Sequence, residues 1–116
     1  MTDPVEEQVE AYNARDLERF IACYSPGVVI EDGEGKRLME GHEAMRAVYG
    51  PGFAKGNVRA EILNRIRVGS TVVDEERVSG LNPNGSDLHA IVAYRLDGNK
   101  IFHVRFLASA ASESDP

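Results

Sequence analysis

Cysteine, tryptophan and histidine are scarce in this chain of 116 residues, which has one Cys, no Trp and three His. Because Cys23 has no second cysteine to pair with, an internal disulfide is excluded, and this suits a reducing compartment. No cluster of His and Cys has the spacing of metal ligands. We therefore expect no metal site.

Basic residues are also in the minority, since 13 Lys and Arg stand against 19 Asp and Glu, giving a net charge of −6 and a pI of about 5.0. Such a surface repels phosphate backbones and anionic lipids, so we expect no nucleic acid partner and no membrane binding. No apolar run approaches the roughly 20 residues of a membrane span, and the first residues lack the pattern of a secretory signal. We expect a cytoplasmic protein.

The length is that of one domain built around one hydrophobic core. The last residues are rich in Ser, Ala and acid, which is typical of disorder. The sequence predicts a single domain over residues 1–108 and a disordered tail over residues 109–116.

The first half of the chain predicts helices. Residues 3–6 supply a cap acceptor, a proline and an acid, and apolar residues at helical spacing follow, with Gln8 directed near the core. A second helix is predicted over residues 17–24. A third helix is predicted over residues 42–49, and it should end at Gly50-Pro51-Gly52 because proline and glycine interrupt helices.

The second half predicts strands. A short apolar strand ends at Asp32, and residues 37–40 should pair back on it as a hairpin. Four longer strands with alternating residues follow, over 58–68, 71–79, 88–96 and 100–108. Helices followed by hairpin-connected strands predict an α+β fold, and long strands coil. We therefore expect a cone-shaped roll, in which a strongly curved, mainly antiparallel sheet packs on the helices and encloses a pocket.

Alternation along these strands predicts which side chains face the pocket. On the strand over residues 58–68, the even-numbered residues should face inward throughout. The residues predicted to face inward on the next three strands are Val73, Glu75, Arg77 and Ser79, then Leu88, Ala90, Val92 and Tyr94, then Phe102, Val104 and Phe106. The outer face should carry His89, Ile91, Ala93 and Arg95, followed by Ile101, His103, Arg105 and Leu107.

Four segments carry a family resemblance: Ala-Tyr-Asn-Ala-Arg-Asp-Leu at 11–17, Val-Ile-Glu-Asp-Gly at 29–33, Gly-His-Glu-Ala-Met-Arg-Ala-Val-Tyr at 41–49 and Asp-Gly-Asn-Lys-Ile at 97–101. With them the chain resembles the SnoaL-like, ketosteroid isomerase-like branch of the nuclear transport factor 2-like superfamily. That superfamily also includes small polyketide cyclases and limonene epoxide hydrolase. The resemblance covers nearly the whole chain, and it implies a homodimer formed through the outer sheet face.

The resemblance also assigns roles to single residues. Asp32 falls where ketosteroid isomerase has the Asp that moves the proton. Gln8 falls where that enzyme has its oxyanion-hole Tyr, and Val92 falls where it has a protonated Asp. Gln8 or Tyr94 would then have to replace the missing donors.

Compared with limonene epoxide hydrolase, Arg77 matches a catalytic Arg on the corresponding strand. Ser79 and Phe106 stand where that enzyme has its two Asp residues. By this resemblance, the chain has one catalytic residue of the limonene epoxide hydrolase set and lacks the other two.

Asp32 has two interpretations. In an apolar hollow its pKa would rise, which suits a general base, whereas in a turn its carboxylate would accept backbone hydrogen bonds. Arg77 could pair with Asp32, pair with Glu75, or bracket a polar ligand group together with Glu75.

Two functions remain open from the sequence. The first is an isomerase-like or cyclase-like enzyme for a small apolar substrate, without a cofactor, in which Asp32 shuttles a proton and Arg77 helps to orient the substrate oxygen. The second is a non-catalytic module of the same fold that binds an apolar ligand or dimerises. Beyond Asp32 and Arg77, the predicted ligand-binding residues are Gln8, Tyr12, Glu75, Ser79, Ala90, Val92, Tyr94, Val104 and Phe106.

Overall fold

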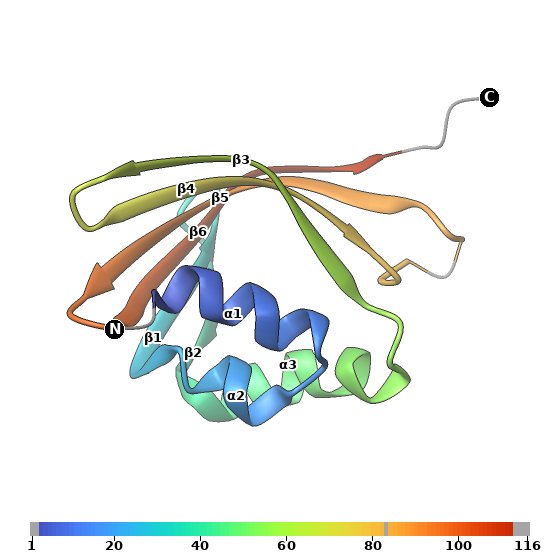
Figure 1. Cartoon of the computed structure of the whole chain (residues 1–116), viewed down its shortest axis with the longest axis horizontal. Helices are drawn as coiled ribbons and strands as arrows, with labels where there is room; N and C mark the ends of the chain where they lie inside the picture. The colour runs from blue at the N-terminus through green and yellow to red at the C-terminus, as the bar shows by residue number, and fades with distance from the viewer. Residues whose placement is uncertain (1–2, 83, 113–116) are drawn as a thin grey trace.

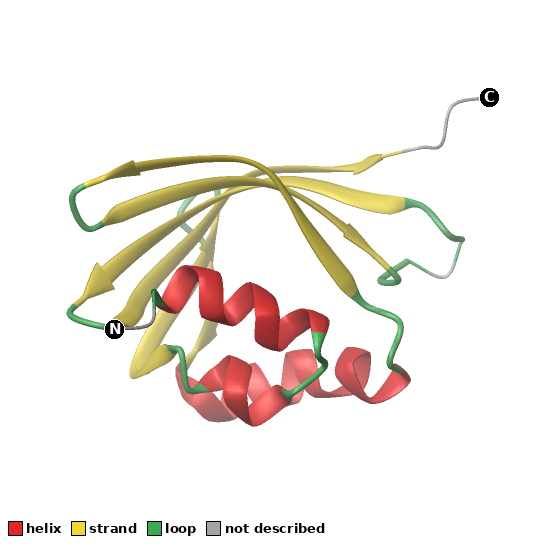
Figure 2. Ribbon diagram, viewed as in Figure 1, coloured by secondary structure: helices red, strands yellow, loops and turns green. Residues whose placement is uncertain are grey.

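Three helices lie against one face of a curved six-stranded sheet in the computed structural model, which describes residues 3–82 and 84–112 (Figures 1 and 2). The helices are α1 (Pro4–Asn13), α2 (Leu17–Ile21) and α3 (Gly41–Lys55). The strands are β1 (Tyr24–Asp32), β2 (Arg37–Glu40), β3 (Arg59–Val68), β4 (Thr71–Ser79), β5 (Asp87–Asp97) and β6 (Lys100–Ser112). No helix in these described ranges has the length and apolar character needed to cross a membrane.

The sheet has the order β2-β1-β6-β5-β4-β3, in which β1 and β6 run parallel and the other neighbours run antiparallel. The predicted α+β fold with a curved, mixed sheet is therefore confirmed. β2 pairs with β1 as the expected hairpin. The strands wrap around the helical layer because long strands twist and coil.

Capping fixes where the first two helices begin. The Asp3 carboxylate accepts a hydrogen bond of 2.9 Å from the backbone N–H of Val5, and Asp16 accepts one of 3.2 Å from Arg19. These bonds satisfy N–H groups that have no partner inside the helix. Within α1, Gln8 and Tyr12 are both buried.

α3 is longer than predicted, because it continues through Pro51 to Lys55. The predicted end at residues 50–52 is wrong. The buried Phe53 ring packs edge-on against Tyr12 at 5.1 Å between centroids, and this packing compensates for the proline. The helix ends before Gly56, whose φ of 72° is the left-handed conformation that glycine adopts readily.

The predicted inner face of β4 is wrong. The buried residues are Val72, Asp74, Glu76 and Val78, so Val73, Glu75, Arg77 and Ser79 lie on the outer side. On β5 the prediction is confirmed for Ala90, Val92 and Tyr94, which are all buried. Both faces of β4 contain charged residues, so alternation separated the faces without showing which one is inside.

Bulges reverse the alternation in two other strands. On β3, Ile62 pairs with Glu76 and Asn64 pairs with Glu75, so Leu63 is an extra residue and the even-numbered residues face outward beyond it. In β6, a register shift opposite Arg95 and Leu96 leaves Phe102 as an extra residue and turns Ile101 inward, where it is fully buried. The predicted inward face of residues 64–68 and the predicted outward position of Ile101 are therefore wrong.

The last strand is also longer than predicted. β6 extends to Ser112, which pairs with Asp87 of β5, so residues 109–112 are part of the sheet and not of a disordered tail. Residues 113–116 of the predicted tail lie outside the described part of the chain.

Candidate functional site

A cavity of about 110 Å³ lies between the helices and the concave face of the sheet. Aromatic and aliphatic side chains form most of its wall, and Leu81, which is 44% exposed, lies at its mouth. The lining side chains come from Gln8, Val9, Tyr12, Phe20, Tyr24, Ile30, Tyr49, Ala60, Glu76, Val78, Leu81, Leu88, Tyr94, Val104 and Phe106. Such an apolar hollow with few polar groups is the usual form of a small-molecule site.

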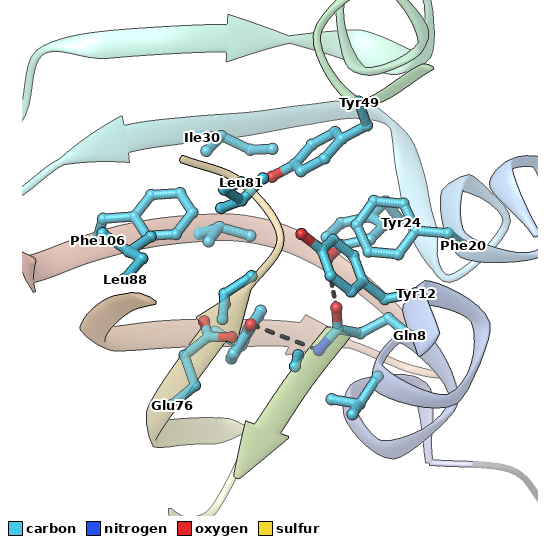
Figure 3. A pocket seen from close by; sticks show the side chains of 15 residues that line it. Gln8, Tyr12, Phe20, Tyr24, Ile30, Tyr49, Glu76, Leu81, Leu88 and Phe106 are labelled. Atoms are coloured by element: carbon cyan, nitrogen blue, oxygen red, sulfur yellow. Dashed lines mark hydrogen bonds between the residues drawn. The ribbon is translucent and has the colours of Figure 1, made fainter. Parts of the chain in front are cut away.

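Among the side chains that line the cavity, Glu76 is the one that carries a carboxyl group. It points into the cavity from β4, across from Gln8 and Tyr12 of α1 (Figure 3). The residue is 9% exposed, and among the described residues no hydrogen bond or ion pair reaches its carboxyl. Burial, with the nearby charge of Asp74, raises the pKa of Glu76 to about 7. A carboxyl group with this pKa can take up and release a proton near neutral pH.

Asp74, the neighbouring acid on the same face of β4, is paired. Arg65 of β3 donates two hydrogen bonds to its carboxylate, at 2.7 and 2.9 Å. The Asp74 side chain is fully buried and the Arg65 side chain is 24% exposed. Two parallel N–H···O bonds of this kind compensate a buried carboxylate for the loss of water.

A short chain of hydrogen bonds crosses the wall opposite Glu76. The Gln8 Nε2 donates to the backbone carbonyl of Val5 at 3.1 Å and to the Tyr94 hydroxyl at 3.4 Å, while Gln8 Oε1 accepts from the Tyr24 hydroxyl at 3.1 Å (Figure 3). The Val5 carbonyl can only accept, and this fixes the orientation of the amide. The Tyr94 oxygen therefore accepts from Gln8, and its own hydrogen is left for an acceptor in the cavity.

The tyrosines of the cavity remain protonated at neutral pH. Burial raises the pKa values of Tyr12, Tyr24, Tyr49 and Tyr94 above the ordinary value of a tyrosine. Each hydroxyl is thus a neutral hydrogen-bond donor, and Glu76 is the group of this wall that changes charge near pH 7.

Five of the predicted ligand-binding residues come together around this cavity: Gln8, Tyr12, Tyr94, Val104 and Phe106. Ala90 and Val92 are buried on the same sheet face without reaching the cavity surface. Their roles with a ligand stay predictions.

The two residues predicted as catalytic lie elsewhere. The Asp32 carboxylate accepts hydrogen bonds of 2.9 Å from the backbone N–H groups of Glu34 and Lys36, which is the arrangement of a turn acid, and it does not line the cavity. Arg77 and Ser79 border a depression at the sheet edge. The structure does not bring Asp32 and Arg77 into one site, and a catalytic role for either stays a prediction.

Glu75 is on the outer side of β4, where it accepts hydrogen bonds from Asn64 at 2.6 Å and shares one of 2.7 Å with His89. The sequence-based assignment thus selected Glu75 in place of its neighbour Glu76. One signal was available: valines at 72 and 78 flank the acids of the true inner face, whereas the other face has valine only at 73. The described residues include no cluster of three or more His, Cys, Asp or Glu arranged to hold a metal ion.

The fold is a small α+β roll with an apolar cavity between the helices and the sheet. The model of the SnoaL-like domain family matches residues 5–104, and the chain belongs to this family, within the nuclear transport factor 2-like superfamily. Among curated proteins, no sequence matches the chain significantly.

Solved structures show the same fold. An uncharacterised cystatin-fold protein from Novosphingobium aromaticivorans has a TM-score of 0.80 and 24% identity, over 90% of this chain and 95% of that one. A protein assigned provisionally as a polyketide cyclase, from Sinorhizobium meliloti, has a TM-score of 0.74 and 24% identity over 90% and 94%. A computationally designed 17-OHP binder has a TM-score of 0.76 and 15% identity, over 96% of each chain. At these identities the similarity establishes the fold alone.

Proposed function

We propose that this protein is an acid–base enzyme of the isomerase or cyclase kind, which acts on a compact apolar molecule with a carbonyl group and uses Glu76 as the proton carrier. The observation that carries the proposal is the unpaired Glu76 carboxyl in an apolar cavity, with a pKa raised to about 7. Tyr94 offers a hydrogen-bond donor to the same cavity.

The chemistry follows from these two groups. The Glu76 carboxylate takes a proton from the carbon next to the carbonyl, and the electron pair of that C–H bond becomes an enolate. The enolate oxygen accepts the hydrogen bond of Tyr94, which stabilises the developing charge. In an isomerisation, Glu76 returns the proton to a different carbon. In a cyclisation, the enolate carbon attacks a second carbonyl of the same molecule, and the proton goes to the new alkoxide.

The cavity volume limits the size of the substrate. A closed cavity of roughly 150 Å³ holds one benzene ring. The cavity of this chain, about 110 Å³, therefore suits a molecule of about one ring that extends toward the opening at Leu81. A four-ring steroid would require lining side chains to move.

The test is hydrogen–deuterium exchange of cyclohexanone in D₂O, followed by NMR. Its single ring suits the cavity, and exchange next to the carbonyl reports proton removal whatever the final product is. We expect the protein to accelerate exchange, and the rate to rise with pH through a midpoint near 7 because the base must be ionised. Exchange no faster than in buffer, together with binding of cyclohexanone, would favour the non-catalytic ligand-binding module.

The proposal includes a homodimer formed through the outer sheet face. The helices cover only the inner face (Figure 2), and the outer face exposes Ile66 by 65% and Ile91 by 40%. A two-fold pair of identical faces would bury these side chains. Ile91→Asp is therefore expected to shift sedimentation to the monomer. Val48→Asp, at an apolar residue of α3 that is 55% exposed, is the control and should leave the dimer intact. A wild-type protein that sediments as a monomer contradicts this part of the proposal.

A further inference from the structure

The two buried acids of β4 have different cross-strand neighbours. Asp74 pairs with Arg65 of β3, whereas Glu76 pairs with Ile62. On the β5 side, Asp74 is opposite Val92 and Glu76 is opposite the small Ala90. One acid therefore has a cation as a cross-strand neighbour, whereas the cross-strand neighbours of the other are both apolar.

The bulge at Leu63 produces this difference. Ile62 faces inward, so in a regular strand Leu63 would face outward, Asn64 inward and Arg65 outward. The extra residue turns Asn64 outward, where it bonds Glu75, and turns Arg65 inward to the Asp74 carboxylate. A bulge that redirects a side chain beside a pocket is a recurrent device of β-sheets.

The other groups around Glu76 carry no charge near neutral pH. The titratable side chains that face it from the elements packed against β4 are Tyr12 of α1, Tyr24 of β1, Tyr49 of α3 and Tyr94 of β5. Burial raises the pKa of each of these tyrosines. Among the described residues, the charge that acts on Glu76 is thus that of Asp74 on its own strand, and the Asp74 carboxylate is in turn paired with Arg65 of β3.

We propose that the bulge at Leu63 commits Arg65 to Asp74, and that Glu76 therefore stays without a cationic partner. Glu76 is then the carboxyl group that exchanges protons with a molecule bound in the cavity. Arg65 and Asp74 are then positioning residues, because they act on a ligand only through the charge state of Glu76. The inference rests on the proposed function only for the catalytic use of Glu76. The electrostatic relation itself can be tested without turnover.

The experiment is a pH titration of the Glu76 carboxyl carbon by NMR, with the resonance assigned from its loss in Glu76→Gln. Asp74→Asn keeps the shape and removes the negative charge, so the midpoint of Glu76 should fall by about one pH unit. Arg65→Gln leaves the carboxyl groups of Asp74 and Glu76 without a cation. The pair should then lose its last proton at a pH about one unit above the Glu76 midpoint of the wild type.

Two controls separate charge from folding. Arg67→Gln removes an arginine from the same strand whose ion-pair partner is Asp3, and it should leave the Glu76 midpoint unchanged. Arg65→Lys keeps the positive charge and should return the midpoint toward the wild-type value. An unchanged midpoint in both Asp74→Asn and Arg65→Gln, or shifts in the same direction, would overturn the inference. Opposite shifts together with absent exchange of cyclohexanone would instead overturn the proposed function and leave this inference standing.

Discussion

Glu76→Gln is expected to slow the protein-catalysed exchange of cyclohexanone hydrogens by about 10²–10⁴-fold, which is the usual contribution of one general base. Glutamine has nearly the same shape as glutamate, so the cavity wall is conserved while the proton acceptor is lost. The measurement is the exchange rate at pH 8, where the wild-type carboxyl, with its pKa of about 7, is ionised.

Asp32→Asn is the matched control, because it makes the same chemical change at the acid that the family resemblance favours. An asparagine side chain keeps an oxygen that can accept from the Glu34 and Lys36 backbone N–H groups. We expect the exchange rate of this variant to stay within about twofold of the wild type, since the proposed base is intact. Loss of exchange in Asp32→Asn but not in Glu76→Gln would reverse the assignment in favour of Asp32.

The same Glu76→Gln variant should be more stable than the wild type above pH 7. Because burial raises the pKa of Glu76 from 4.5 to about 7, the folded chain holds this proton more tightly than the unfolded chain. The resulting stabilisation is complete below pH 4.5 and is lost as the pH rises through 7. The wild type loses on the order of 3 kcal/mol of its free energy of unfolding in this way. The Glu76→Gln variant avoids this loss because glutamine does not titrate. Urea unfolding at pH 5 and pH 8 measures the difference.

Phe20→Ala is expected to have the largest effect on stability, a loss of about 3–5 kcal/mol in the free energy of unfolding. Phe20 is 2% exposed and lies at the centre of an aromatic cluster. Its ring centroid lies 4.9–5.7 Å from those of Tyr12, Tyr24, Tyr49 and Phe53. These rings come from all three helices and from β1, so the substitution opens a cavity where the helical layer meets the sheet.

Urea unfolding followed by circular dichroism tests this expectation. Val48→Ala removes apolar atoms from a side chain that is 55% exposed and should change the free energy by less than about 0.5 kcal/mol. Phe20→Leu retains most of the buried apolar area, so its free energy of unfolding should fall clearly less than that of Phe20→Ala. Equal losses in Phe20→Ala and Val48→Ala would mean that the aromatic cluster does not hold the helices on the sheet.

The order of the elements and the fold could be predicted from local signals. Asp3 and Asp16 mark helix starts because their carboxylates bond N–H groups only a few residues away. The inner face of β5 could also be predicted, since Ala90 and Val92 alternate with residues that do not fill the core. Each of these signals depends on residues that are close in the sequence.

The candidate site depended on contacts between distant segments. Glu76 was missed because either face of β4 carries an acid, and alternation does not show which acid has an arginine beside it. The bulge at Leu63 decides that Arg65 reaches Asp74, and no residue type marks this bulge in advance. The extension of α3 through Pro51 is similar, because Phe53 finds its partners on α1 and α2.

The sequence by itself determined the family, the element order and an apolar hollow between helices and sheet, because caps, turns and periodicity act over a few residues. Only the tertiary structure decided which carboxyl faces that hollow: Asp32 is held by its own turn, whereas Glu76 is buried without a cation. The physical reason is that burial and pairing of a charge are set by neighbouring strands, and strand register is a property of the assembled sheet.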